Sequence, residues 1–150
     1  MENTNNTQQV IAINGQYTKD LSFESPNSPA SLLPKPTPPK IDIALNLEVN
    51  ELEKDIYEVS IEVTVKANQE ETTMFILELA YCGVFTVKNF EGEQKDMILL
   101  IHCPTILFPY ARRIISDVTR DGGFQPLMID PIDFSALYRQ RKEDVSKTKN

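Results

Sequence analysis

Residues 55–66 read DIYEVSIEVTVK, and apolar and polar side chains alternate through nearly the whole stretch. The odd positions carry Tyr57, Val59, Ile61, Val63 and Val65, and the even ones include Glu58, Ser60, Glu62 and Thr64. Neighbouring side chains of a β-strand point to opposite faces of its sheet. The pattern therefore predicts a sheet with one buried face and one solvated, mostly acidic face. Such a surface is typical of a binding protein rather than an enzyme.

Three further strands are predicted, at about 11–24, 40–49 and 73–87, because apolar residues alternate there as well. The last of these strands is apolar on both faces, which indicates an additional contact beyond one sheet face. Short connections at 50–54 and 68–71 favour antiparallel hairpins.

A proline-rich segment separates the first two predicted strands. Six of the ten prolines lie between Pro26 and Pro39. Proline has no backbone N–H and fixes φ, so we expect a stiff, extended crossover rather than a helix or a central strand. Leu32 and Leu33 lie in the middle of this crossover and need an apolar surface to cover.

The last third of the chain carries helix signals. Met97–His102 is an apolar run of undecided type. A first helix is predicted at Ile106–Arg120, with Thr105 as its cap and Pro109 confined to the first turn. A second helix is predicted to begin at Asp133, which is a good N-cap residue.

This order of elements defines an α+β fold. We expect a four-stranded antiparallel sheet with a Pro-rich crossover and two C-terminal helices packed on one side. Residues 1–10 are expected to be a disordered tail, 11–141 a single domain, and 142–150 a flexible C-terminal tail.

The charge of the chain limits its partners. The formal net charge is −7, which argues against nucleic acid because no basic patch could replace phosphate counterions. The segment from Asp42 to Glu78 contains ten acidic residues and only two basic ones, Lys54 and Lys66, so its net charge is −8. This density fits either an ordinary solvated surface or a docking face for a basic partner.

The compartment is expected to be the cytosol. Cys82 and Cys103 have no metal-ligand spacing and suggest buried, free thiols in a reducing environment. The polar N-terminus lacks the basic and apolar regions of a signal peptide. No apolar run reaches the roughly 20 residues of a membrane helix, so no membrane insertion is expected.

Catalysis finds little support. His102 is the only histidine, and in an extended segment it would point away from the adjacent Cys103. A pair of Cys82 with His102 across strands stays open on geometry alone. Glu58 and Glu62 are expected on a solvated face, where carboxylates have no reason for the raised pKa of a general acid. No phosphate loop, nucleophile elbow or metal motif is present in the sequence.

Five segments carry a resemblance to a known family: Tyr17–Asn27, Ile56–Val59, Cys103–Arg112, Gly123-Phe124 and Pro131–Leu137. Together they resemble the SecB chaperones of bacterial protein export. They occur in the family's order and at similar spacing over about residues 11–141.

The resemblance implies a homotetramer built as a dimer of dimers. It also implies that unfolded preproteins are held without ATP or any cofactor and are passed to SecA, the motor of the Sec translocase. The family's SecA-docking positions correspond to Asp20, Glu24, Ile76 and Glu78.

Two more sets of residues follow from the resemblance. Positions around the contact between dimers correspond to Leu77, Leu79, Tyr81, Tyr110 and Ile114. The client groove of the family, between sheet, crossover and second helix, corresponds to Leu32, Leu33, Ile43, Leu45, Phe134, Leu137 and Tyr138. Any residue of either set could instead belong to the ordinary core.

Three functions are compatible with the sequence. The favoured one is a chaperone that holds many precursors for export. The second is a SecB-like chaperone dedicated to one client such as an antitoxin. The third is a hydrolase that uses Cys82 or Cys103 with His102.

Overall fold

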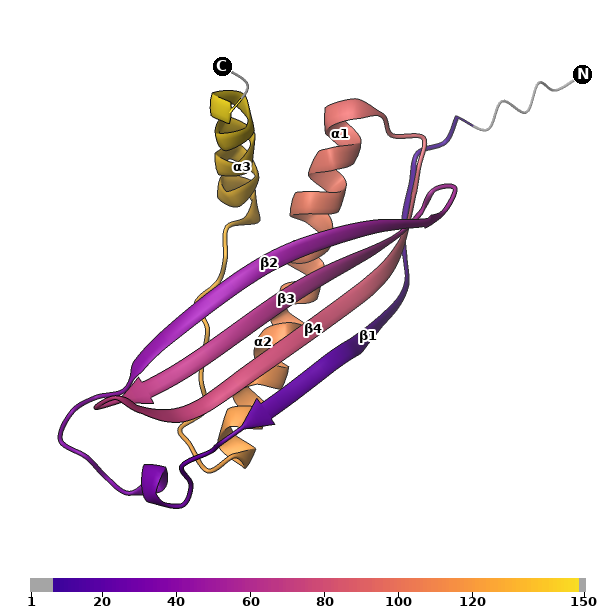
Figure 1. Ribbon diagram of the computed structural model, residues 1–150. Helices are drawn as coiled ribbons and strands as arrows, with labels where there is room; N and C mark the ends of the chain where they lie inside the picture. The colour runs from indigo at the N-terminus through magenta and orange to yellow at the C-terminus, as the bar shows by residue number, and fades with distance from the viewer. Residues whose placement is uncertain (1–6, 149–150) are drawn as a thin grey trace, which may run out of the picture.

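The computed structural model describes residues 7–148 and contains one antiparallel sheet of four strands in the order β1-β4-β3-β2. The strands are β1 (Val10–Glu24), β2 (Lys40–Glu53), β3 (Ile56–Gln69) and β4 (Thr72–Lys88). Short hairpins join β2 to β3 and β3 to β4, and the long crossover carries the chain from one edge of the sheet to the other (Figure 1). The predicted α+β class and antiparallel sheet are confirmed.

The alternation in β3 sets the two faces of the sheet. Val59, Ile61 and Val65 are 0 % exposed, and they lie on the face that the helix covers. Residues paired directly across antiparallel strands share a face, so Val63 and its partner Leu79 continue the same apolar layer. We call this side the helix face and the opposite side the open face.

Strand β1 departs from simple alternation. Its pairing with β4 shifts between Ile13 and Gly15 and again between Thr18 and Asp20. A β-bulge of this kind moves the following side chains to the other face. Thr18 pairs with Tyr81 and therefore belongs to the helix face, whereas Asp20, two residues later, pairs with Ala80 on the open face. Tyr17, which lies between the two shifts, pairs with Cys82 and therefore lies on the open face.

One continuous helix of 30 residues follows the sheet, from Gly92 to Asp121. It consists of α1 (Gly92–Met97), the π-helical turn η2 (Ile98–His102) and α2 (Cys103–Asp121). The predicted start near residue 105 was therefore wrong by about four turns at 3.6 residues per turn.

The prediction of the helix start failed for two reasons. Thr105 does not cap the helix, since its hydroxyl donates to the carbonyl of Ile101 one turn earlier. Pro109 lies inside α2 rather than in a first turn. Proline removes one helical hydrogen bond and commonly marks a helix end or a kink, so Pro109 looked like a residue near a helix boundary.

Helix α2 packs across the centre of the sheet, against β3 and β4. Leu107, Ala111 and Ile115 recur at four-residue spacing and are completely buried. Gly83 permits the close approach, because a Cβ atom there would come within 2.9 Å of Leu107 Cδ2.

The Gly92–Asp121 helix is, by length and composition, apolar enough to cross a bilayer, which the sequence analysis did not expect. In the described residues, 44 % of its most apolar 18-residue window is buried within the chain. Its remaining surface includes exposed apolar side chains such as Met97 and Tyr110. The helix thus has a second apolar face that the sheet leaves partly uncovered.

The crossover and the last helix complete the fold. The crossover was expected to be extended, but it contains a turn at 26–29, the 3-10 turn η1 (Ala30–Leu32) and a bend at 36–37. Helix α3 (Phe134–Thr148) begins as predicted after Asp133, whose Oδ1 accepts the N–H of Ala136 at 3.1 Å. It stands beyond the β2 edge and contacts η2 (Figure 1).

The predicted domain ends need adjustment. Residues 142–148, expected as a flexible tail, belong to α3, which continues to Thr148. Of the expected N-terminal tail at 1–10, Val10 is already part of β1, and residues 1–6 lie outside the described residues.

Candidate functional site: two apolar grooves and an acidic sheet face

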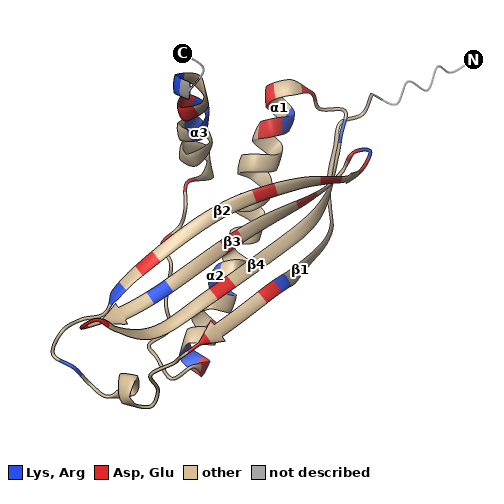
Figure 2. Ribbon diagram, viewed as in Figure 1, with Lys and Arg blue, Asp and Glu red and all other residues tan. Residues whose placement is uncertain are grey.

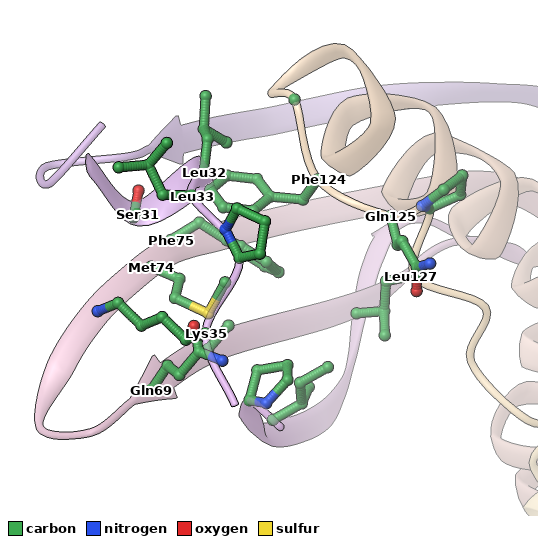
Figure 3. Close-up of a pocket in the computed structure, with 16 residues that line it drawn as sticks. Ser31, Leu32, Leu33, Lys35, Gln69, Met74, Phe75, Phe124, Gln125 and Leu127 are labelled. Atoms are coloured by element: carbon green, nitrogen blue, oxygen red, sulfur yellow. The ribbon is translucent and has the colours of Figure 1, made fainter. Parts of the chain in front are cut away.

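The larger groove lies beneath the crossover and has a volume of about 660 Å³. Its floor is aromatic: the rings of Phe75 and Phe124 lie 5.0 Å apart, and Phe23 stacks on Phe75 at 5.6 Å. Leu32 and Leu33 of the crossover face this floor together with Lys35 (Figure 3). The arrangement offers an open apolar surface with a polar and cationic rim.

The crossover keeps its leucines accessible. Leu33 is 66 % exposed, and Leu32 is also exposed on its outer side. Leu32 packs above Gly123, where a Cβ atom would lie 3.2 Å from Leu32 Cδ2. The φ of Gly123 is +91°, a backbone conformation that favours glycine. Exposed apolar side chains that gather beside a groove are typical of a binding surface.

A second groove of about 410 Å³ lies between β2 and α3. Leu45 and Leu47 of β2 form one wall, and Leu137 and Tyr138 of α3 form the other. Arg141 adds a charged group to the rim, as does Asp144 one helical turn further on.

The structure divides the seven predicted groove residues. Leu32 and Leu33 line the first groove, and Leu45, Leu137 and Tyr138 line the second. Ile43 is 44 % exposed on β2 and lines neither groove. Phe134 is only 2 % exposed and packs edge-on against Phe108 at 6.0 Å, so it belongs to the core rather than to a groove.

Most residues of the first groove's floor were not predicted from the sequence. Phe75, Phe124 and Leu127 come from β4 and from the segment after α2, which are distant in sequence. One signal was available in the sequence, because Gly123-Phe124 is among the segments that resemble the family.

The open face carries acidic residues on all four strands (Figure 2). Register brings the predicted docking residues together, because Glu24 pairs with Ile76 and Ser22 pairs with Glu78. Asp20 pairs with Ala80 on the same face. A shallow hollow of about 440 Å³ is lined there by Asp20, Glu78 and two acids that the prediction did not include, Glu48 and Glu62.

Glu58 differs from its neighbours on this face. It was expected in solvent, but it is only 8 % exposed. The bulge in β1 brings Tyr17 over it, and the Tyr17 hydroxyl donates to Glu58 Oε2. Lys19 Nζ lies 3.0 Å from Glu58 Oε1. These two donors, the tyrosine first, lower the pKa of Glu58, whereas burial and Glu58 raise the pKa of Tyr17.

The five predicted interface residues separate into two kinds. Leu77 and Leu79 are fully buried in this chain's own core, a role that the resemblance alone did not assign. Tyr81 is also buried, and its ring stacks on Tyr110 with centroids 6.0 Å apart. Tyr110 is 46 % exposed and Ile114 is half-buried, so these two belong to the second apolar face of the helix.

The thiols do not form a catalytic pair with His102. Cys82 lies on the open face, where its Sγ contacts Ser60 Oγ at 3.3 Å, while His102 belongs to the helix on the opposite side. Burial raises the pKa of the Cys103 thiol to about 12, and burial also raises the pKa of Cys82. A thiol with a raised pKa is a poor nucleophile. Within residues 7–148, no cluster of His, Cys, Asp and Glu could hold a metal ion.

These features define a class of protein: a sheet-and-helix protein with open apolar grooves on one side of the sheet and an acidic face on the other. The family model described as "Preprotein translocase subunit SecB" matches residues 4–145. The chain therefore belongs to the SecB family, and it is a chaperone of Sec-dependent protein export.

Curated relatives agree with this assignment. The "Protein-export protein SecB" of Bartonella quintana is 46 % identical over 97 % of this chain and 92 % of its own length. The protein of the same name from Rickettsia akari is 45 % identical over 94 % of this chain and 93 % of its own length.

A solved structure shares the fold. The SecB-like chaperone of Mycobacterium tuberculosis, in complex with a peptide from the HigA1 antitoxin, superposes with a TM-score of 0.66. The two chains are 14 % identical, and the match covers 81 % of this chain and 90 % of the other. At this identity the likeness speaks for the fold alone.

Proposed function

We propose that the two grooves hold unfolded precursor proteins as extended segments. The observation that carries this proposal is the pair of open apolar grooves, of about 660 and 410 Å³, with exposed leucines at their rims. An extended client gains affinity by occupying several weak sites at once, which needs no tight single contact.

Strand β2 connects the grooves. Ile41 lines the first groove, Leu45 lines the second, and Ile43 lies between them on the same face. Alternate residues of a strand are about 6.8 Å apart, so the row from Ile41 to Leu45 spans roughly 14 Å. An extended client segment of four or five residues could therefore reach from one groove to the other.

We further propose that the open face docks SecA through Asp20, Glu24, Ile76 and Glu78. Support comes from the register, which places the four on one face, and from the acidic hollow beside them. Opposite charge speeds the capture of a basic partner and makes it sensitive to salt. Ile76, which lies between Glu24 and Lys66 of the neighbouring strands, adds an apolar contact to this charged surface.

The second apolar face of the long helix supports assembly into a homotetramer, a dimer of dimers. Tyr110 and Ile114 are the residues we assign to the contact between dimers, with Tyr81 supporting Tyr110 from below. We place the assembly in the cytosol, where the free thiols of Cys82 and Cys103 would stay reduced. We also infer that the protein is not an enzyme and needs no cofactor.

A matched pair of variants tests the client groove. Leu33→Asp puts a charge at the rim of the first groove, and Leu52→Asp puts the same charge on an exposed leucine at the far end of β2. We expect at least tenfold weaker binding of a fluorescently labelled, urea-unfolded precursor for Leu33→Asp only. Equal binding by both variants and the unaltered chain would remove the groove from the proposal.

The dedicated-client alternative makes a different prediction. Purification of the tagged chain from its own cells should return many precursors if the export role is general. Recovery of one small protein in stoichiometric amount would favour the dedicated role instead.

A further inference from the structure

Both ends of the crossover are attached to the same hairpin, the turn between β3 and β4 (Figure 1). At the first end, Asn27 Nδ2 donates to the carbonyl of Thr73 at 2.8 Å. At the second end, Thr37 Oγ1 donates to Glu70 Oε1 at 2.9 Å, and Gln69 Nε2 donates to the carbonyl of Thr37. The tip of this hairpin is thus a fixed point for the segment that covers the first groove.

The hairpin tip has an unusual backbone. Glu70 and Glu71 have φ values of +50° and +65°, in the left-handed region. Hairpin turns with this geometry favour Asn and Gly, because other L-residues adopt it at a cost. Two consecutive glutamates are therefore a poor choice for the turn itself, and an observed outlier of this kind points to a use for the side chain.

Only one of the two glutamates has such a use in the described residues. The Glu70 carboxylate binds Thr37, whereas no bond joins Glu71 to the crossover within residues 7–148. Gln69, next to Glu70, is buried and lines the first groove while it holds the carbonyl of Thr37. The same tip therefore touches both the groove and the crossover.

The position of Thr37 makes this attachment effective. Lys35 and Pro39 on either side of it line the first groove, and Pro36 and Pro38 flank it directly. Proline fixes φ, so a segment with several prolines moves as a stiff unit. Fixing Thr37 therefore also fixes the groove-lining residues on both sides.

We propose that Gln69 and Glu70 are positioning residues, which clasp the Pro-rich crossover over the first groove and so lengthen the time that a client segment stays bound. The proposal rests on the client-holding role of that groove. We expect the clasp to change the rate at which a client leaves rather than the rate at which it binds. The reason is that the clasp holds the wall of the groove in place and does not change the charge of the groove.

The test compares Glu70→Gly with Glu71→Gly. Glycine relieves the left-handed backbone at both positions, but only the first substitution removes the clasp. Hydrogen exchange is measured on the full chain without client. We expect crossover amides such as Leu33 N–H, which donates to Ala30 O, to exchange several-fold faster in Glu70→Gly than in Glu71→Gly. Equal exchange in the two variants would overturn the clasp.

The second readout is release of a labelled, urea-unfolded precursor. For Glu70→Gly we expect a dissociation rate raised roughly threefold, the value for one lost exposed hydrogen bond, with the association rate unchanged. Thr37→Val should give the same increase, and the double variant should add nothing further. Release as slow as in Glu71→Gly, or additive effects, would contradict the proposal. If the unaltered chain bound no precursor while the exchange difference was present, the client-holding role would fail and the clasp would stand.

Discussion

The two faces of the sheet are built from the same four strands but behave differently. On the helix face, the β3 residues Val59, Ile61 and Val65 are completely buried under α2. On the open face of the same strand, Glu58 is buried while Thr64 and Lys66 are exposed. The helix face is uniform along its length, and the open face changes character from one end to the other.

The difference shows how one sheet separates stability from binding. The helix face removes apolar area from water and supplies most of the driving force for folding. No helix covers the open face where it carries Asp20, Glu24 and Glu78. These three side chains are therefore available for a partner. At its other end, the bulge in β1 covers Glu58 with Tyr17 and Lys19, which anchors the edge strand that carries Asp20 and Glu24.

The largest expected effect on stability distinguishes two adjacent residues of β4. Leu77 is buried on the helix face and Ile76 is half-buried on the open face. Leu77→Ala should lower the free energy of unfolding by about 3 kcal/mol, because it leaves a cavity, and Ile76→Ala by less than about 1 kcal/mol. Urea unfolding followed by circular dichroism measures both, and equal losses would mean that the faces do not differ as described.

A smaller effect is expected from adding a methyl group under the helix. Gly83→Ala would place a Cβ atom 2.7 Å from Phe85 Cε2 and 2.9 Å from Leu107 Cδ2, which should cost about 1–3 kcal/mol. Gly15→Ala on β1 meets nothing within 4 Å and should be neutral or slightly stabilising. A melting temperature for Gly83→Ala as high as for Gly15→Ala would show that α2 does not pack tightly there.

The hydrogen bonds of Tyr17 and Lys19 to Glu58 should contribute about 1 kcal/mol to the free energy of unfolding. This contribution should depend on pH. The pKa of Glu58 is lowered in the folded chain, so its stabilisation is present above the unfolded-state pKa and is lost as pH falls through the folded-state pKa. Glu58→Gln should therefore be less stable than the unaltered chain at pH 7, with the gap closing in acid. Glu62→Gln, whose partner is the exposed Asn46, is the control. A gap that is independent of pH would contradict the ion pair.

The smallest effect on stability should come with a large effect on binding. Glu78→Lys reverses the charge of an exposed side chain on the open face and should change the free energy of unfolding by at most about 0.5 kcal/mol. Its affinity for SecA at low salt should fall about tenfold or more, while client binding is unchanged. Glu143→Lys on α3 is the matched control, and equal SecA affinity for both variants would remove Glu78 from the docking face.

The sequence predicted the elements that depend on local pattern. All four strands were found because a period of two is visible in the residues themselves, and Asp133 marked the start of α3 correctly. The long helix was found only in part, because Gly92 begins it without a capping side chain and Pro109 resembles a boundary.

The site was less accessible to prediction than the fold. The burial of Glu58 depends on a bulge in β1, which alternation does not reveal. The floor of the first groove depends on Phe75 meeting Phe124, and such long-range contacts leave no periodic signal. The clasp at Glu70 depends on the path of the crossover, which proline content makes stiff but does not direct.

The central claim is that this chain holds unfolded proteins on one side and docks SecA on the other. The most direct test is the mass of the purified protein in solution by light scattering, alone, with an unfolded precursor, with the same precursor folded, and with SecA. We expect a mass near four chains that increases with the unfolded precursor and with SecA but not with the folded precursor. A single chain whose mass is indifferent to all three additions would contradict it.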